Sequence, residues 1–198
     1  MRTLEPQTRF LLRGSASLIG LLALWWFVLA DPMLYLLKGA AAAFVEIDEH
    51  PSGDWTLRVP VDVTLKATSQ KIESIDFDMA RSDAITFTFS LPVLWAIFLA
   101  APAYKVRPLV IGTLVMAAIE VSLLVAFAQC TARENASQFT GADDAIGQWM
   151  HRLGAYLTVS VLPYVAPFLV ALTLHRQLRD GVFGGAAFAS RPHAPSRK

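Results

Sequence analysis

The sequence predicts a mainly helical integral membrane protein with four membrane-spanning helices and a small antiparallel β-rich segment between the first two. Of its 198 residues, 55% are hydrophobic and 17% are charged, whereas ordinary soluble domains have about a quarter of their residues charged. Four stretches are mainly apolar over the roughly 20 residues that a helix needs to cross a bilayer. Between the first two stretches, the apolar residues change from a helical to an alternating pattern, which is typical of strands.

The first predicted span covers residues 10–30, and its one charged residue, Arg13, lies close enough to the end to reach the membrane surface. A cleavable signal peptide is a second interpretation, because a basic start precedes the apolar stretch and the small Ala30 ends it. The apolar stretch is long for a signal peptide, and the bulky Trp25 and Trp26 stand where smaller residues are usual. We therefore favour an uncleaved anchor.

Three further spans are predicted, at residues 85–101, 109–128 and 153–174. The distribution of lysine and arginine between the spans predicts the orientation, because basic segments stay in the cytoplasm. Ten of the 17 basic residues lie near the N-terminus, in the turn between the second and third spans, or in the C-terminal tail. We therefore expect a multi-pass protein of the bacterial inner membrane with both termini cytoplasmic.

The remaining segments follow from this orientation. The predicted cytoplasmic segments are residues 1–9, 102–108 and 175–198, and the last of these is expected to be a basic, disordered tail suited to weak contact with anionic lipid. Residues 31–84 carry five basic against ten acidic residues and are predicted to lie outside, as is the loop at residues 129–152.

The segment outside the membrane contains two stretches in which apolar and polar residues alternate, one beginning at Trp55 and one ending at Met79. His50–Asp54 has the composition of a hairpin turn, residues 65–70 are a second turn candidate, and residues 43–47 are a candidate for a further strand. A sheet of this size cannot bury a large core by itself. We expect it to pack on the membrane surface, on the loop at residues 129–152 or on a partner, and its edges could add a peptide strand.

Glu120 lies near the middle of the third span, where an unpaired charge costs several kcal/mol. The interpretation that we favour is structural, with the carboxyl group hydrogen-bonded to Tyr156, Thr158 or Ser160 of the fourth span. A contact with a partner's helix and a proton or ion relay are the alternatives.

Pro163 and Pro167 lie four residues apart in the fourth span, so they share one face of the helix. Each proline removes a backbone hydrogen bond and bends the helix, which membrane helices tolerate when neighbours satisfy the freed carbonyls. A fixed kink for packing is favoured over a gating hinge.

No catalytic, cofactor-binding or metal site is predicted. Acidic and histidine residues cluster twice, but solvated charge on outer loops explains both groups better than a divalent cation site; they are Glu46, Asp48, Glu49 and His50, and Asp143, Asp144 and His151. The one cysteine, Cys130, excludes an internal disulfide, and a small buried thiol is its default role. A phosphate-binding glycine loop is absent from the sequence, and no nucleic-acid partner is expected.

The chain resembles the exosortase H-associated membrane proteins over about residues 8–178. Three stretches carry the resemblance: RFLLRGSASLIGLLALWWFVLADPMLYLLKG, FSLPVLWAIFLAAP and LGAYLTVSVLPYVAPFLVAL. It implies an accessory encoded with an exosortase, a membrane-embedded Cys/Arg/His enzyme that processes exported proteins bearing a short C-terminal sorting tail. No catalytic residue is carried over, because members of the family have no established activity. Cys130 and Arg133 are present, but their surroundings do not fit the exosortase itself.

Three functions are weighed on this basis. The first is a non-catalytic accessory whose outer sheet docks an exosortase-type enzyme or its exported substrates, with membrane lipid as its surroundings. The second is a small transport or channel component that uses Glu120 and the kinked fourth span. The third, a membrane-embedded hydrolase or transpeptidase, would need Cys130 or a serine as its nucleophile. The first is the prediction.

Overall fold

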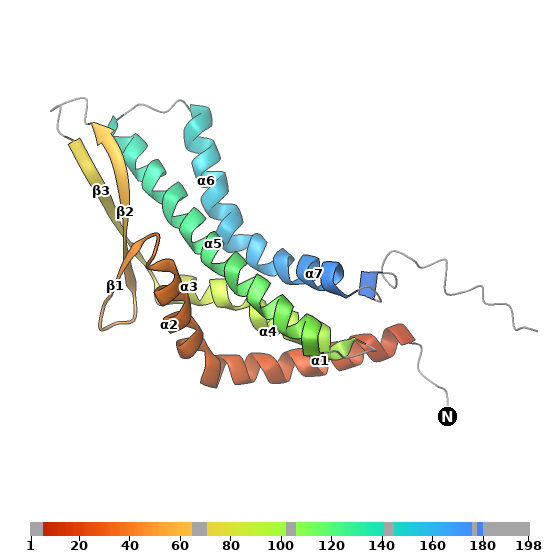
Figure 1. The fold of residues 1–198 in the computed structure, drawn as a ribbon. Coiled ribbons are helices and arrows are strands. Elements are labelled where there is room, and N and C mark those ends of the chain that lie inside the picture. The colour runs from red at the N-terminus through yellow and green to blue at the C-terminus, as the bar shows by residue number, and fades with distance from the viewer. Residues whose placement is uncertain (1–5, 65–70, 102–105, 141–144, 176–177, 180–198) are drawn as a thin grey trace, which may run out of the picture.

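The computed structural model describes residues 6–64, 71–101, 106–140, 145–175 and 178–179. It shows a bundle of helices that carries a three-stranded antiparallel sheet at one end (Figure 1). The predicted mainly helical class with a small antiparallel sheet is therefore confirmed. Several predicted features lie outside the described residues: the turn at residues 65–70, most of the turn at 102–108, nearly all of the tail, and the pair Asp143 and Asp144.

The first helix continues beyond Ala30, where the sequence places the end of the first span. It consists of α1 (Pro6–Leu24), a π-helical turn η1 (Trp25–Leu29) and α2 (Ala30–Ala41). Within the turn, the Ala30 N–H bonds to the Trp25 carbonyl, five residues back. The turn ends three residues before Pro32, whose ring would clash with the carbonyl four residues earlier in a regular helix. Such π-turns change the course of a helix, and α2 leaves the line of α1 here (Figure 1).

The sheet has the order β1-β2-β3, with β1 at Glu46–Glu49, β2 at Trp55–Thr64 and β3 at Lys71–Met79. Trp55 pairs with both Glu49 and Met79, so the middle strand is β2. The predicted alternation is confirmed, because Trp55, Leu57 and Val59 are all buried on one face. A register shift between Pro60 and Val63 gives the irregularity that the proline in this strand predicts.

The third long helix, α5 (Val106–Thr140), has 35 residues. At 1.5 Å per residue it is about 52 Å long, which exceeds a bilayer core of about 30 Å. The sheet packs on its far end, where three buried alanines at four-residue spacing form one face: Ala128, Ala132 and Ala136. Small side chains at this spacing let the sheet approach closely. The sequence offered the membrane surface, the segment at residues 129–152 or a partner as the surface under the sheet, and the sheet packs on α5, which includes the first part of that segment. The described residues of the segment, 129–140 and 145–152, are helical, whereas a loop was predicted.

The other helices complete the bundle. The second apolar segment is divided at Phe89 into α3 (Arg81–Thr88) and α4 (Ser90–Ala100). The last one is divided at Val161 into α6 (Ala145–Ser160) and α7 (Leu162–Leu174), with a bend of 61° between them. Among the described residues, three helices are long and apolar enough to cross a membrane, or four if the bent pair forms one span.

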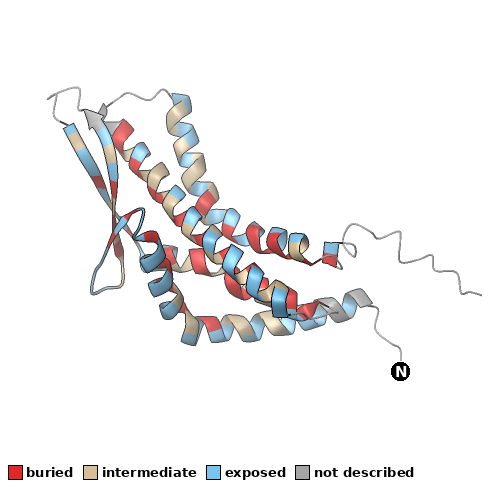
Figure 2. Ribbon diagram, viewed as in Figure 1, coloured by how far each residue is buried: buried red, intermediate tan, exposed pale blue. Residues whose placement is uncertain are grey.

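Two hydrophobic cores meet along α5. The first joins the sheet, α2, α3 and the far half of α5, and includes Trp55, Leu57 and Phe87. The second joins α4, the near half of α5 and α7, and includes Leu94 and Phe98. Buried residues face inward between the helices, whereas long stretches of α1, α2 and α6 are exposed (Figure 2). Both cores contact Ile119, one position before Glu120.

Candidate functional site

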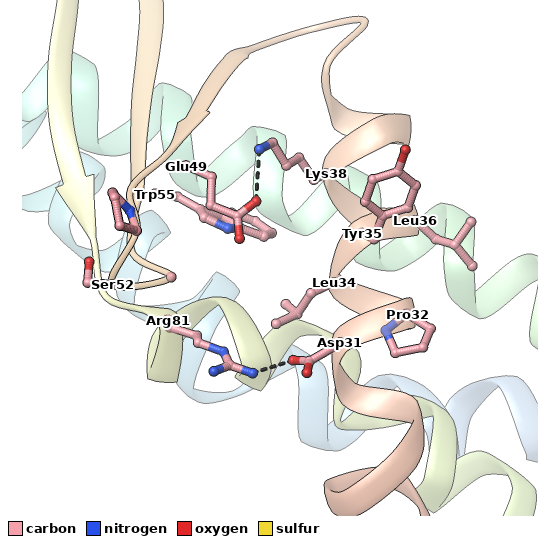
Figure 3. Close-up of a pocket in the computed structure, with 12 residues that line it drawn as sticks. Asp31, Pro32, Leu34, Tyr35, Leu36, Lys38, Glu49, Ser52, Trp55 and Arg81 are labelled. Atoms are coloured by element: carbon pink, nitrogen blue, oxygen red, sulfur yellow. Dashed lines mark hydrogen bonds and ion pairs between the residues drawn. The ribbon is translucent and has the colours of Figure 1, made fainter.

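The cleft beside the sheet is the first candidate site. It has a volume of about 760 Å³ and opens between α2, the turn from β1 to β2, and the start of α3 (Figure 3). Trp55 closes its floor at 2% exposure, while Tyr35 stands at its edge with 77% of its surface exposed. The cleft therefore combines a rigid aromatic floor with an open, polar rim.

Two ion pairs cross this cleft. The Lys38 Nζ lies 3.0 Å from the Glu49 Oε2 and links α2 to β1. The guanidinium of Arg81 pairs with Asp31 and links α3 to α2. Both pairs are partly exposed, and such pairs contribute about 0–1 kcal/mol each. Because they are weak, an incoming charged ligand could exchange with either pair at low cost.

Arg81 is held from three directions. Its backbone N–H donates to the Asp54 Oδ1 at 3.0 Å, so Asp54 satisfies a free donor at the start of α3. This hydrogen bond, followed by one that Ser52 donates to Asp54, lowers the pKa of the Asp54 carboxyl group below its ordinary value of 3.8. Gly53 has a φ of 87° and lies under the Arg81 side chain, whose Cδ would be 2.9 Å from a Cβ on that glycine. The positive φ and the close approach of Arg81 both favour glycine at this turn.

Sequence reasoning did not single out Arg81 or the cleft. The signal in the sequence was a basic residue in an acidic segment, two residues after β3 and four residues before the second predicted span. The partners of Arg81 come from two distant segments, Asp31 and Asp54. Hydropathy and charge counts do not show that these segments meet.

The outer face of the sheet carries a hydrogen-bonded network of charged and polar residues. Arg58 lies between Asp76 and Glu46, with its Nε 3.0 Å from the Asp76 Oδ1, and the hydrogen bond and charge of Asp76 raise the pKa of Arg58 above its ordinary value. Thr56 donates to Asp78 at 2.7 Å and also contacts the His50 ring at 2.7 Å. Among the described residues, no group of three or more histidine, cysteine, aspartate or glutamate side chains is arranged to hold a metal ion.

Glu120 is the second candidate, and it is buried at 3% exposure between α5 and α4. The hydroxyl of Ser90, itself fully buried at the first position of α4, donates to its Oε1. The expected partners on the fourth span are therefore wrong. Thr158 donates to carbonyls of its own helix instead, and Tyr156 and Ser160 are exposed. Ser90 reaches Glu120 because α4 packs against α5 and buries both side chains between the two helices.

Pro163 lies in the first turn of α7, two residues after the break at Val161, and Pro167 lies inside α7. A proline is well accommodated in a first turn, where no backbone partner is lost. Both prolines are buried, so they belong to the packed face of α7. Whether the bend is fixed or opens as a hinge stays a prediction.

Cys130 lies where α5 crosses α6. Its Sγ would be 2.8 Å from a Cβ added to Gly154, so the two helices are in close contact at this glycine. Nearby, the Nε of Arg152 pairs with the Glu134 Oε1 at 2.6 Å. The thiol is half-buried and packs against the facing helix.

A family model described as exosortase H-associated membrane protein matches residues 4–178 of the chain. The chain belongs to this family. The resemblance drawn from the sequence is therefore confirmed, and membership together with the apolar helices supports a membrane protein. No curated protein and no solved structure matches the chain. The family name associates these membrane proteins with exosortase H, and it assigns no reaction and no residue.

Proposed function

We propose that this chain is a non-catalytic accessory of an exosortase H-type sorting system, and that the cleft at the base of the sheet is its docking site. The observation that carries the proposal is the position of this cleft. It lies where the sheet, α2 and the start of α3 meet, in the acidic segment between the first two apolar helices. In the orientation favoured by the basic residues, the cleft faces the outer side of the inner membrane.

The chemistry of the cleft suits an extended, charged polypeptide. Leu34 and Trp55 offer apolar contact, while Lys38, Arg81 and Glu49 offer charges of both signs. The Lys38–Glu49 pair lies on the surface, so a ligand carboxylate could take the place of Glu49 beside Lys38. An exported protein with a sorting tail, or an outer loop of the exosortase, has the extended form that such a cleft accepts.

The proposal is tested by site-specific photocrosslinking in native membranes that contain the exosortase and a sorting-tail substrate. A photoreactive residue replaces Tyr35 at the rim of the cleft, and the matched control replaces Leu114, which is 66% exposed on the opposite half of α5. We expect the Tyr35 position to capture exosortase or substrate and the Leu114 position to capture neither. Capture of lipid alone at both positions would contradict the docking proposal.

Charge exchange sharpens this test. Lys38→Glu places a second carboxylate beside Glu49. It should lower the yield of crosslinked product from position 35 several-fold without changing the amount of the protein in the membrane. Affinity purification through a C-terminal tag in mild detergent supplies the second measurement. Recovery of the protein alone, as a discrete oligomer, would weaken the accessory role.

A transport function has two observations in its support, the 61° bend between α6 and α7 and the carboxyl group of Glu120 buried inside the bundle. Its hydrogen bond to Ser90 favours a structural contact instead, because the carboxyl group already has a partner within the chain. Glu120→Gln separates the two functions. A relay loses its flux when the group can no longer exchange a proton, whereas a structural amide still accepts the hydrogen bond from Ser90.

A further inference from the structure

A second groove, separate from the docking cleft, lies on the other side of Arg81. It has a volume of about 940 Å³ and is bounded by the π-turn between α1 and α2, by α3, and by Tyr164 of α7. Its lining is mainly apolar and aromatic: Leu22, Trp25, Trp26, Phe27, Ile85 and Phe89. Trp26 and Phe27 are 62% and 82% exposed, so the groove opens onto the outer surface of the bundle.

The polar groups of the groove are concentrated at one end. Arg81 and Ser82 stand at the start of α3, while the apolar residues continue along α1 and α3. The guanidinium of Arg81 is 46% exposed and pairs with the surface carboxylate of Asp31. A cation at the head of an apolar groove matches a ligand that has an anionic head and a hydrocarbon tail.

Trp25 supplies an independent observation. Its ring is buried at 3% exposure, packs edge-on against Phe89 at 5.8 Å, and lines the groove. Its indole N–H finds no acceptor among the described residues. A buried donor without an acceptor is unfavourable, and a protein normally provides a partner for it. An ester or phosphate oxygen of a bound lipid has the chemistry of such an acceptor.

The position of the groove also points to lipid. Tryptophan and tyrosine gather at the level of lipid head groups, and here Trp25, Trp26 and Tyr164 surround the groove. Arg81 begins the candidate span Arg81–Ala100 directly beyond the sheet, and the π-turn interrupts the candidate span Leu12–Ala41, so the head of the groove lies at the sheet end of one span and beside the bend of another. A peptide would need acceptors and donors along its backbone, which this lining does not offer.

We propose that this groove binds one anionic phospholipid, with an acyl chain along Trp26, Phe27 and Phe89 and the phosphate beside Arg81. The lipid links α1, α3 and α7 at the point where the first helix bends. Arg81 also borders the docking cleft, so a lipid bound in the groove fixes the side of the cleft that Arg81 forms. The proposal requires only a membrane protein and does not rest on a role in sorting.

The test counts bound lipid by native mass spectrometry, after phosphatidylglycerol or phosphatidylcholine is added to the full chain in mild detergent. We expect one tightly held phosphatidylglycerol per chain and weaker retention of phosphatidylcholine. Arg81→Gln should lower phosphatidylglycerol retention about tenfold or more, as the loss of a charged hydrogen bond implies. Arg107→Gln, a basic residue at the start of α5, is the matched control and should retain the lipid.

Two further variants separate binding from folding. Asp31→Asn breaks the same ion pair as Arg81→Gln but leaves the cation, so it should hold phosphatidylglycerol as well as the wild type or better. Ala23→Trp, at an exposed position in the groove, should reduce retention of both lipids by filling the space. The proposal is overturned if the wild type holds no lipid, if Arg81→Gln binds like the wild type, or if Asp31→Asn loses lipid as Arg81→Gln does.

Discussion

One helix, α5, passes through two regions that hold together by different means. At its far end, three small alanines receive a β-sheet whose outer face is covered by ion pairs and hydrogen bonds. At its near end, α5 packs against α4 and α7, and the described polar contacts are few and internal, such as Trp95 donating to Thr113 at 2.9 Å.

The difference reflects the two solvents that the chain is expected to meet. Water competes for surface ion pairs, so the sheet region depends on burying Trp55, Leu57 and Val59 in the first core. In lipid, burial between helices gains little hydrophobic free energy, so the bundle depends on close packing and internal hydrogen bonds. The same type of substitution should therefore have unequal effects in the two regions.

The largest expected effect is that of Trp55→Ala. The side chain is 2% exposed and lies under both neighbouring strands, and its loss should cost about 3–5 kcal/mol. Amide hydrogen–deuterium exchange should become much faster in all three strands of the sheet and stay unchanged over the near half of α5. Trp149→Ala, at a position 61% exposed on α6, is the control with little effect. Equally fast exchange in both regions would show that the two cores form one cooperative unit.

The second prediction concerns close packing in the bundle. A Cβ on Gly112 would lie 2.9 Å from the Phe98 ring, which is itself 2% exposed and cannot easily move. Gly112→Ala should therefore destabilise the bundle by about 1–3 kcal/mol.

The control for this substitution is Gly20→Ala on α1, where a Cβ would have open space within 4 Å. It should leave stability unchanged or raise it by about 0.5–1 kcal/mol, because alanine is the better helix former. Thermal unfolding in detergent micelles measures both variants. A neutral Gly112→Ala would mean that α4 and α5 can separate, and the bundle would then be the looser region.

The third prediction concerns the internal hydrogen bond. Ser90→Ala leaves the buried Glu120 carboxyl group without its observed donor, at a cost of about 1–3 kcal/mol. Ser122→Ala is the matched control, because that exposed hydroxyl bonds only to the Ala118 carbonyl of its own helix. Thermal unfolding in the same micelles compares the two. If both variants unfold at the wild-type temperature, Glu120 is not held by Ser90, and the relay alternative gains support.

The sequence was a good guide to the sheet and a poorer one to helix lengths. Alternation of apolar residues predicted the buried face of β2, because one face of the sheet rests on protein and the other meets water. The far end of α5 was predicted to be a loop because its residues turn polar after Ala128. The alanines at positions 128, 132 and 136 were the available signal, since a helix brings every fourth residue to one face.

Side-chain partners inside the bundle were beyond prediction. In a helix surrounded by lipid, apolar residues face outward as well as inward, so hydropathy does not tell which face is buried. The sequence identified Glu120 but assigned its hydrogen bond to the fourth span and not to the second, because hydropathy does not show which helix lies opposite a buried carboxyl group. The docking cleft was missed for a related reason, since its residues come from four separate elements.

The smallest expected effect is the pH dependence of the sheet region through Asp54. Its pKa is lowered by the hydrogen bonds from Arg81 and Ser52, so the folded state favours the ionised carboxylate. The contribution is fully present above the unfolded value of 3.8 and is lost as the pH falls through the lower folded value. In the Asp54→Asn variant, the stability of the start of α3 should therefore fall less steeply than in the wild type as the pH drops below 3.8. Exchange rates of the α3 amide groups between acidic and neutral pH measure this, with Asp48→Asn on exposed β1 as the control. A steep acid transition that survives Asp54→Asn would show that other carboxylates of the sheet, and not this cap on α3, set the acid limit of the region.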